Sequence, residues 1–540
     1  MHKTSLILLF LSLLSLASSF KISKNNRFIL DDAGRATIFH GVNVVVKLPP
    51  YIPNTDKFDP LNSLTAEDIK YMKQMGFNLV RLGIIWESVE RKEGQYDLAY
   101  LQKMKALVNQ LGENGIYTMI DAHQDVFSRK FCGEGVPYFY TEKIGYENKC
   151  KSSAISQILN WINVCKPMDS YGFRLDANGL PLVEDCKTHN FVDYHFAPEM
   201  TSAYKSFFDN KYNIQEKFAK FWQVVAKEFK GNKYVIGYDL WNEPFPGGLF
   251  DNLWLLWPDK ADMEQLLPVY AKVDKAIREV DPNYILFFEN MPFPDNIPLF
   301  GGLQLGKFTK RPAGDKNPQV YNVHNYCCLS GPTVCSGPEP DLNTAKNKCP
   351  EYHKKKVEQN LKDATNIKTP LIISEFGACS DSEDCYHEIL SVVKAAEPNF
   401  VSWAYWMYKP FGDHTTSAIA LVEKEGIYNK DGTIQAVKEK GLTRAYVQYY
   451  QGTPVSFKFT NDNTNFETVF QFDSAISKGT RIYFNKKLYY SKGYNVSVTN
   501  ESTKAVISVK VTNDGENYID ITGIPSNLNG KNVKITFTAK

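Results

Sequence analysis

The sequence predicts an α/β protein, namely a (β/α)8 TIM barrel followed by a small C-terminal antiparallel β-sandwich. Three observations lead to this prediction. Eight short apolar runs rich in β-forming residues occur before residue 410, and stretches with helical spacing separate most of them. Beyond residue 450 the hydrophobic pattern changes to short runs in which apolar and polar residues alternate, and turn residues separate these runs.

The eight barrel strands are expected in runs that are almost continuously apolar. These runs are Thr37–Val46, Asn78–Ile84, Tyr117–His123, Val235–Asn242, Tyr284–Glu289, Gln319–Tyr326, Pro370–Phe376 and Phe400–Tyr408. Such runs are typical of parallel strands that are buried on both faces. A doubly wound open sheet is the alternative, but the sequence has no glycine-rich phosphate-binding turn to support it.

Helices are expected where apolar residues recur three and four positions apart. These stretches are Ala66–Met75, Leu98–Glu113, Ser202–Phe229, Ala261–Val280, Tyr352–Thr365 and Glu383–Ala396, with a last helix over Ala436–Tyr450. Between His123 and Ser202, almost eighty residues show little periodicity. This insertion occurs where a barrel keeps its substrate loops, so we expect it to shape the binding cleft.

The C-terminal strands are expected in seven alternating runs. These are Val455–Phe459, Thr468–Phe472, Thr480–Phe484, Tyr494–Thr499, Ala505–Val511, Tyr518–Ile521 and Val533–Phe537. The predicted organisation is a signal peptide over residues 1–20, a barrel catalytic domain over 21–450 and a β-sandwich over 451–540.

The N-terminus has the pattern of a secretory signal. A lysine at position 3 precedes the leucine-rich run Ser5–Leu16, and the small residues Ala17–Ser19 follow it. The apolar run is shorter than the ~20 residues of a transmembrane helix. We therefore expect a protein that is secreted or resides in the lysosomal or vacuolar lumen. Sequons at Asn495 and Asn500 agree with a glycoprotein of the secretory route.

All ten cysteines lie between Cys132 and Cys385, which fits disulfide bonds formed in an oxidising compartment. The close pairs Cys335/Cys349 and Cys379/Cys385 are the expected bridges, whereas Cys327 and Cys328 have no assigned partners. The spacing lacks the paired Cys-x-x-Cys clusters of a zinc site, so no metal and no cofactor are predicted.

The charge balance excludes binding partners that need a strong electrostatic field. Lys and Arg together number 62 and Asp and Glu number 60, so nucleic acid is not an expected partner. No stable protein partner is predicted either.

Two glutamates carry the prediction of activity. Asn242-Glu243-Pro244 closes one strand run, and Glu375 lies near the end of another. In a parallel barrel every strand delivers its last residues to one face, so these carboxylates are expected to meet across a single cleft. Cleavage of a glycosidic bond needs such a pair, with one carboxyl protonated and the other ionised.

The flanking residues suggest which glutamate has which role. Arg81, on the second strand run, is expected to lower the pKa of Glu375 so that this side chain stays ionised as a nucleophile. Glu243 is then the acid/base, with the Asn242 amide beside it. Spacing alone leaves the order of the two roles open.

The identity and order of several residues at the strand ends resemble the pattern of a known family. Arg81, His123, Asn242-Glu243, His324, Tyr326, Glu375 and Trp406 follow one another on successive strands, as in the retaining glycoside hydrolase family 5. The segments Gly41–Tyr51, His123–Ser128, Gly133–Pro137, Gly237–Gly247 and Ser374–Ala378 are similar, more narrowly, to endoglycoceramidases. Those enzymes release the intact glycan from ceramide in glycosphingolipids, and Tyr489–Tyr494 resembles part of their C-terminal β-sandwich.

The resemblance implies a double displacement through a covalent glycosyl enzyme, acting on a glycosphingolipid that is presented at a membrane or micelle surface. It implies that the sugar next to the cleaved bond is bound by Lys47, His123, Asp125, Asn242, Tyr326 and Trp406, with Arg81 and His324 as supporting residues. The insertion between Tyr138 and Met200 matches the family poorly, so its sugar contacts are not assigned.

Two other functions remain open from the sequence. One is a family 5 β-glucosidase or endo-β-glucanase that acts on a steryl glucoside or a polysaccharide, and the other is a non-catalytic carbohydrate-binding barrel. Leu249–Pro258, directly after the acid/base strand, is a candidate apolar wall for a lipid slot, with an ordinary buried loop as the alternative.

Overall fold

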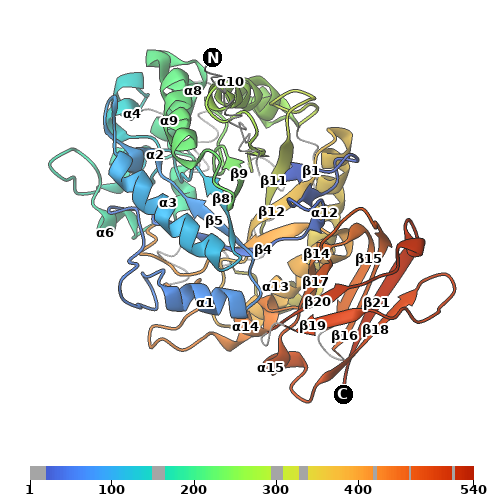
Figure 1. Ribbon diagram of the computed structural model, residues 1–540. Helices are drawn as coiled ribbons and strands as arrows, with labels where there is room; N and C mark the ends of the chain where they lie inside the picture. The colour runs from blue at the N-terminus through green and yellow to red at the C-terminus, as the bar shows by residue number, and fades with distance from the viewer. Residues whose placement is uncertain are drawn as a thin grey trace, which may run out of the picture.

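The computed structural model describes residues 20–148, 165–292, 308–327, 339–416, 423–460, 464–513 and 517–540 (Figure 1). The expected signal segment lies outside the described residues, apart from Phe20, and so do Cys150, Cys328 and Cys335. No helix within the described ranges has both the length and the apolar character needed to cross a membrane.

Eight parallel strands close into a barrel at the centre of the fold. They are β4 (His40–Val44), β5 (Leu79–Gly83), β8 (Tyr117–Asp121), β9 (Val235–Asp239), β10 (Leu286–Glu289), β11 (Gln319–Asn325), β12 (Leu371–Phe376) and β13 (Ser402–Tyr405). Every predicted run contains one of these strands, so the predicted barrel is confirmed. The ring closes where β13 pairs with β4, through Trp403 opposite His40.

Helices cover the outside of the barrel (Figure 1). The longer ones are α1 (Ala66–Gln74), α3 (Leu98–Glu113), α8 (Pro198–Phe208), α9 (Ile214–Phe229), α10 (Leu267–Arg278), α12 (Cys349–Asn366) and α13 (Glu383–Ala396). Shorter ones are α2 (Trp86–Val89), α4 (Tyr138–Ile144), α6 (Val183–Cys186), α7 (Phe191–Tyr194), α11 (Leu342–Asn347) and α14 (Ala436–Leu442). The short helix α15 (Lys486–Tyr489) lies beside the C-terminal strands instead (Figure 1). The start of α1 is fixed by a capping box between Thr65 and Asp68, which satisfies two N-terminal donors.

Two helix predictions need correction. The stretch Ser202–Phe229 was expected to be one helix, but it is divided between α8 and α9, because Asn210, Tyr212 and Asn213 have positive φ. The last predicted helix also ends early, at Leu442. The residues after it form β14 (Tyr446–Tyr450), which pairs on both sides with other strands. Tertiary pairing thus overrides helical spacing in this aromatic segment.

Two antiparallel sheets adjoin the barrel (Figure 1). The larger contains, in order, β1 (Lys21–Ile22), β2 (Ile29–Leu30), β3 (Ala36–Thr37), β14, β17 (Thr480–Tyr483), β20 (Tyr518–Thr522) and β19 (Lys510–Asn513). The smaller contains β15 (Gly452–Thr460), β16 (Asn465–Phe472), β21 (Asn532–Ala539) and β18 (Tyr494–Asn500). The separate hairpin β6 (Glu90–Lys92) and β7 (Gln95–Tyr96) completes the list of strands.

The N-terminal strands therefore share a sheet with C-terminal strands. The pairing of β3 with β14 ties the start of the barrel segment to the second domain. The predicted boundary at residue 450 falls between β14 and β15, which belong to different sheets. The domain limits themselves stay a prediction.

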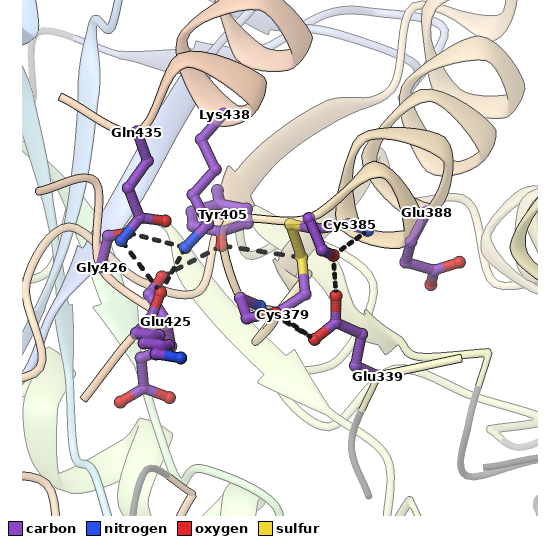
Figure 2. Close-up of a disulfide and its surroundings, with 12 residues drawn as sticks. Glu339, Cys379, Cys385, Glu388, Tyr405, Glu425, Gly426, Gln435 and Lys438 are labelled. Carbon is purple, nitrogen blue, oxygen red and sulfur yellow. Dashed lines mark hydrogen bonds between the residues drawn. A yellow bond between two sulfur atoms is a disulfide. The ribbon is translucent and has the colours of Figure 1, made fainter. Parts of the chain in front are cut away.

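The disulfide bonds confirm one predicted pair and correct the other. Cys379 is bonded to Cys385, as predicted (Figure 2). Cys349 is bonded to Cys327 rather than to Cys335, because β11 and α12 bring their Cα atoms within 5.7 Å. A third bond joins Cys132 to Cys186 and holds two parts of the insertion together.

Candidate active site

The two glutamates meet at the carboxyl ends of the barrel strands. Glu375 lies near the end of β12, and Glu243 follows β9. One carboxylate oxygen of each lies within 4.8 Å of the other and of a ring nitrogen of His324. The structure therefore brings together the three side chains that the sequence placed on separate strands.

Arg81 is the buried centre of the site, as its place on β5 suggested. Its guanidinium donates to Glu375 at 2.6 Å, to Asp239 at 2.8 Å, and to Asp121 at 3.0 Å. It also donates to the side-chain oxygens of Asn43 and Asn242. All five donor positions of a guanidinium suit such a convergent set of acceptors. Burial alone would lower the pKa of Arg81, but the surrounding carboxylates raise it instead.

Glu375 has the contacts expected of a positioned nucleophile. Arg81 donates to one oxygen, and the Tyr326 hydroxyl donates to the other at 3.1 Å. The predicted lowering of its pKa needs correction, because burial raises the pKa of Glu375 although Arg81 acts in the opposite direction. The contact was predicted, but the sequence could not show how deeply the carboxylate is buried.

Glu243 is held without a cation in direct contact. Its Oε1 lies 2.7 Å from Nδ1 of His324, and its backbone N–H donates to Glu289 at 3.1 Å. Burial, reinforced by the Asp125 carboxylate, raises the pKa of Glu243. Burial also lowers the pKa of His324 to about 3, so this neighbour is a neutral imidazole. The direct hydrogen bond from Arg81 favours the ionised form of Glu375, whereas the neighbour of Glu243 is a neutral imidazole.

A second buried ionic group surrounds Lys47. Its ammonium lies 2.6 Å from Asp125 and 2.9 Å from Asp413, and it donates to the Thr415 hydroxyl at 2.6 Å. Burial would raise the pKa of Asp125, but Lys47 offsets this effect and the pKa lies well below its usual value. Lys47 also lies 4.7 Å from the centre of the Trp406 ring. Lys47 and Asp125, each predicted to bind the sugar, therefore form an ion pair at the same strand ends.

His123 and Trp406 form an aromatic pair. Their rings are nearly parallel, with centroids 5.2 Å apart, and Trp406 is 1% exposed. Nδ1 of His123 contacts Asp121 at 2.8 Å, while its buried Nε2 has no partner among the residues that the structure describes. Burial lowers the pKa of His123 to about 4, so the ring is neutral. This arrangement leaves one imidazole nitrogen for a ligand.

The side-chain amide of Asn242 forms hydrogen bonds within the protein. Its oxygen accepts from Arg81, and its nitrogen donates to the backbone carbonyl of Gln124 at 3.0 Å. The Gln124 side chain donates in return to the carbonyls of Asn242 and Glu243. These bonds fix the turn in which Glu243 has a φ of 38°.

Five carboxyl groups around the site were not singled out from the sequence. They are Asp121, Glu134, Asp239, Glu289 and Asp413. Asp121, Asp239 and Glu289 each close a barrel strand, so their position at a strand end was the available signal. Glu134 and Asp413 lie in loops, and only the fold brings them to Lys47.

Among the residues that the structure describes, three groups of side chains have the atom types of a metal site. Arg81 contacts the group of Glu243, His324 and Glu375, and Lys47 contacts the group of His123, Asp125 and Glu134, so a cation is already present beside each. The third group contains Cys327 and Cys349, whose sulfur atoms are bonded to each other.

Comparisons with known proteins agree with this geometry. The family described as cellulase (glycosyl hydrolase family 5) matches residues 37–166 and 177–412. The glycoside hydrolase family 5 C-terminal domain matches residues 444–536.

The chain belongs to glycosyl hydrolase family 5.

Relatives of this family 5 glycosidase align over most of their length. It is 29% identical to an endoglycoceramidase of Cyanea nozakii, over 88% of this chain and 86% of the relative. It is also 29% identical to an endoglycoceramidase of Hydra vulgaris, over 92% and 87%. The fold is similar to endo-glycoceramidase II from Rhodococcus sp. in its ganglioside GM3 complex, with a TM-score of 0.69, 22% identity, and coverage of 96% and 100%.

In this family 5 glycosidase, replacing Arg81 by Met is expected to lower the free energy of unfolding by about 3–5 kcal/mol. The reason is that Asp121, Asp239 and Glu375 would stay buried without their shared cation. Thermal denaturation followed by circular dichroism measures the change as a lower midpoint.

The matched control for this substitution is Arg174→Met. Arg174 also pairs with an aspartate, Asp185, but its side chain is 69% exposed. A solvent-exposed ion pair contributes little to stability, so the midpoint of the control should hardly move. Equal midpoints for the Arg81 variant and the control would contradict the central role of Arg81.

Proposed function

We propose that this glycosidase is a retaining enzyme that cleaves the β-glycosidic bond between the oligosaccharide and the ceramide of glycosphingolipids. The alignment with two proteins named endoglycoceramidase, over about nine tenths of the chain, carries the substrate assignment. The close approach of the two carboxylates supports the retaining reaction, because retaining enzymes hold their carboxyl groups about 5–5.5 Å apart and inverting enzymes about 6.5–9.5 Å apart.

The proposed reaction has two steps. In the first, the Glu375 carboxylate attacks the anomeric carbon while protonated Glu243 gives its proton to the glycosidic oxygen, so ceramide leaves with a free hydroxyl. In the second, Glu243 takes a proton from water, and the resulting hydroxide displaces Glu375 and releases the glycan. The hydrogen bond from Arg81 to Glu375 favours the ionised nucleophile that the first step requires.

The sugar next to the cleaved bond would contact the side chains around the two glutamates. Nε2 of His123 and Nε2 of His324 are buried and have no partner within the described part of the chain, so both are available to sugar hydroxyls. Charged partners for the sugar would come from Lys47 and Asp125. Aromatic contacts would come from Tyr326 and Trp406. Asn242, by contrast, would act mainly by positioning Glu243, since its amide is engaged within the protein.

Product analysis distinguishes this function from the alternatives. The purified protein is incubated with a ganglioside, with glucosylceramide, with a steryl glucoside, and with a soluble β-glucan, beside the Glu375→Gln variant as an inactive control. The expected products are an intact oligosaccharide and ceramide. Cleavage of the β-glucan, or of a steryl glucoside alone, would replace the proposal by the second candidate.

The stereochemistry of the first product provides an independent measurement. We expect the released sugar to appear first as the β-anomer, because two inversions at the anomeric carbon give net retention. Proton NMR of the fresh reaction mixture follows the anomeric signal before mutarotation. Initial appearance of the α-anomer would require a single displacement and would exclude Glu375 as a nucleophile.

A further inference from the structure

Two tryptophans in the loop after β9 are exposed to solvent. Trp254 and Trp257 are each 52% exposed, whereas the other five tryptophans that the structure describes are at most 2% exposed. Their rings stack in parallel, with centroids 5.4 Å apart and an angle of 6° between planes. The segment Leu249–Pro258 is therefore not an ordinary buried loop throughout. Leu249, Phe250 and Leu255 are buried, but the two tryptophans are exposed.

The local backbone holds the pair in this exposed position. Leu253–Leu256 form a 3-10 turn, and the Asn252 side chain caps it by accepting from the Trp254 N–H at 3.1 Å. The Trp257 N–H donates to the Trp254 carbonyl at 2.9 Å. Leu255, at 4% exposure, anchors the turn in the core. The rings are thus presented by a fixed turn rather than by a frayed end.

The turn that holds the pair is uncharged, and acidic residues border it. Residues 252–258 include no charged side chain, whereas Asp251 and Asp259 flank them on either side. Lys260 lies 5.6 Å from the Trp254 ring, and its ammonium pairs with Glu264 at 3.5 Å. Tryptophan is enriched where an apolar phase meets water, because its ring has a large apolar surface and one N–H donor. A neutral turn with two such rings matches a neutral lipid interface better than an anionic one.

The position of the turn relates it to the active site. It follows β9, as Glu243 does, so it belongs to the loops at the carboxyl ends of the strands. That end of the barrel carries the two catalytic glutamates. A lipid surface in contact with the turn would therefore face the end of the barrel at which a glycolipid must enter.

We infer that Trp254 and Trp257 dock the enzyme on an uncharged or zwitterionic lipid surface, such as a phosphatidylcholine membrane. This inference deepens the proposed function and rests on it for its biological purpose. Leu253, Leu256 and Pro258 beside the rings are partly exposed and extend the apolar surface, while the flanking Asp251 and Asp259 would repel an anionic surface. The chemistry therefore favours a lipid over a polysaccharide as the occupant.

The test measures binding to vesicles that contain phosphatidylcholine only and no glycolipid. The double variant Trp254→Ser/Trp257→Ser should bind at least about tenfold more weakly than the unmodified protein in a flotation assay, because it loses the inserted apolar rings. Binding of the unmodified protein should hardly change between low and high salt. Activity on a soluble aryl glycoside should be equal in both proteins.

The matched control is Val506→Ser, which removes another exposed apolar side chain, 78% exposed, from the C-terminal domain. Equal flotation of the double variant and this control would overturn the docking role, as would binding that disappears at high salt. Loss of binding to a β-glucan instead would identify a sugar platform, and loss of a dimer on size-exclusion chromatography would identify a self-association surface. These vesicles hold no substrate, so the binding measurement does not depend on hydrolysis. The docking role can therefore be tested even if the proposed hydrolysis is not observed.

Discussion

A Glu375→Gln variant is expected to lose at least about 10⁵-fold in kcat/KM toward every glycoside substrate. The amide cannot form the glycosyl ester, although it preserves the shape of the side chain and can still contact Arg81 and Tyr326. Initial rates with an aryl glycoside and with a glycosphingolipid measure the loss, and circular dichroism verifies the fold.

Glu397→Gln is the matched control. Glu397 is also a buried glutamate that accepts from an arginine at 2.6 Å, but its partner is Arg444 beside the C-terminal sheets. The control should keep its activity even if it unfolds at a lower temperature. A Glu375→Gln enzyme with activity close to that of this control would remove Glu375 from the reaction.

Replacing Glu243 by Ala is expected to give a loss that depends on the leaving group. For a glycosphingolipid, kcat/KM should fall about 10²–10⁴-fold, because the departing alkoxide then receives no proton. An aryl glycoside with an acidic phenol should lose far less in its first step. Azide should restore part of its turnover and give a β-glycosyl azide, since the space left by the carboxyl admits the anion to the glycosyl enzyme.

The pH dependence provides a further readout of the same variant. Burial keeps Glu243 protonated above the usual pH range of a glutamate, so its deprotonation should set the alkaline limb of the profile. That limb should disappear in Glu243→Ala with the activated substrate, while the acid limb from Glu375 should remain. An α-glycosyl azide product would mean that the two glutamates have exchanged roles.

The barrel could be predicted from the sequence because each of its strands is buried on both faces. Strands such as β9 and β12 therefore appear as short apolar runs, whatever their neighbours. The segment Tyr446–Tyr450 could not be assigned in the same way. Its aromatic residues suit either a helix or a strand, and only pairing with β3 and β17 makes it β14. The partner of Cys349 also could not be identified from spacing in the sequence, because it depends on which cysteine the fold brings close.

For the site, the sequence by itself determined which side chains stand at the strand ends. The parallel barrel carries such residues to one face, so Glu243, His324 and Glu375 had to converge. Only the tertiary structure decided their electrostatics. The pKa of a carboxyl group depends on its burial and on charges within a few ångströms, and Arg81 is shared among three carboxylates that lie far apart in sequence. Likewise, the exposure of Trp254 and Trp257 follows from how the loop packs, because Leu255 enters the core and leaves both rings in solvent.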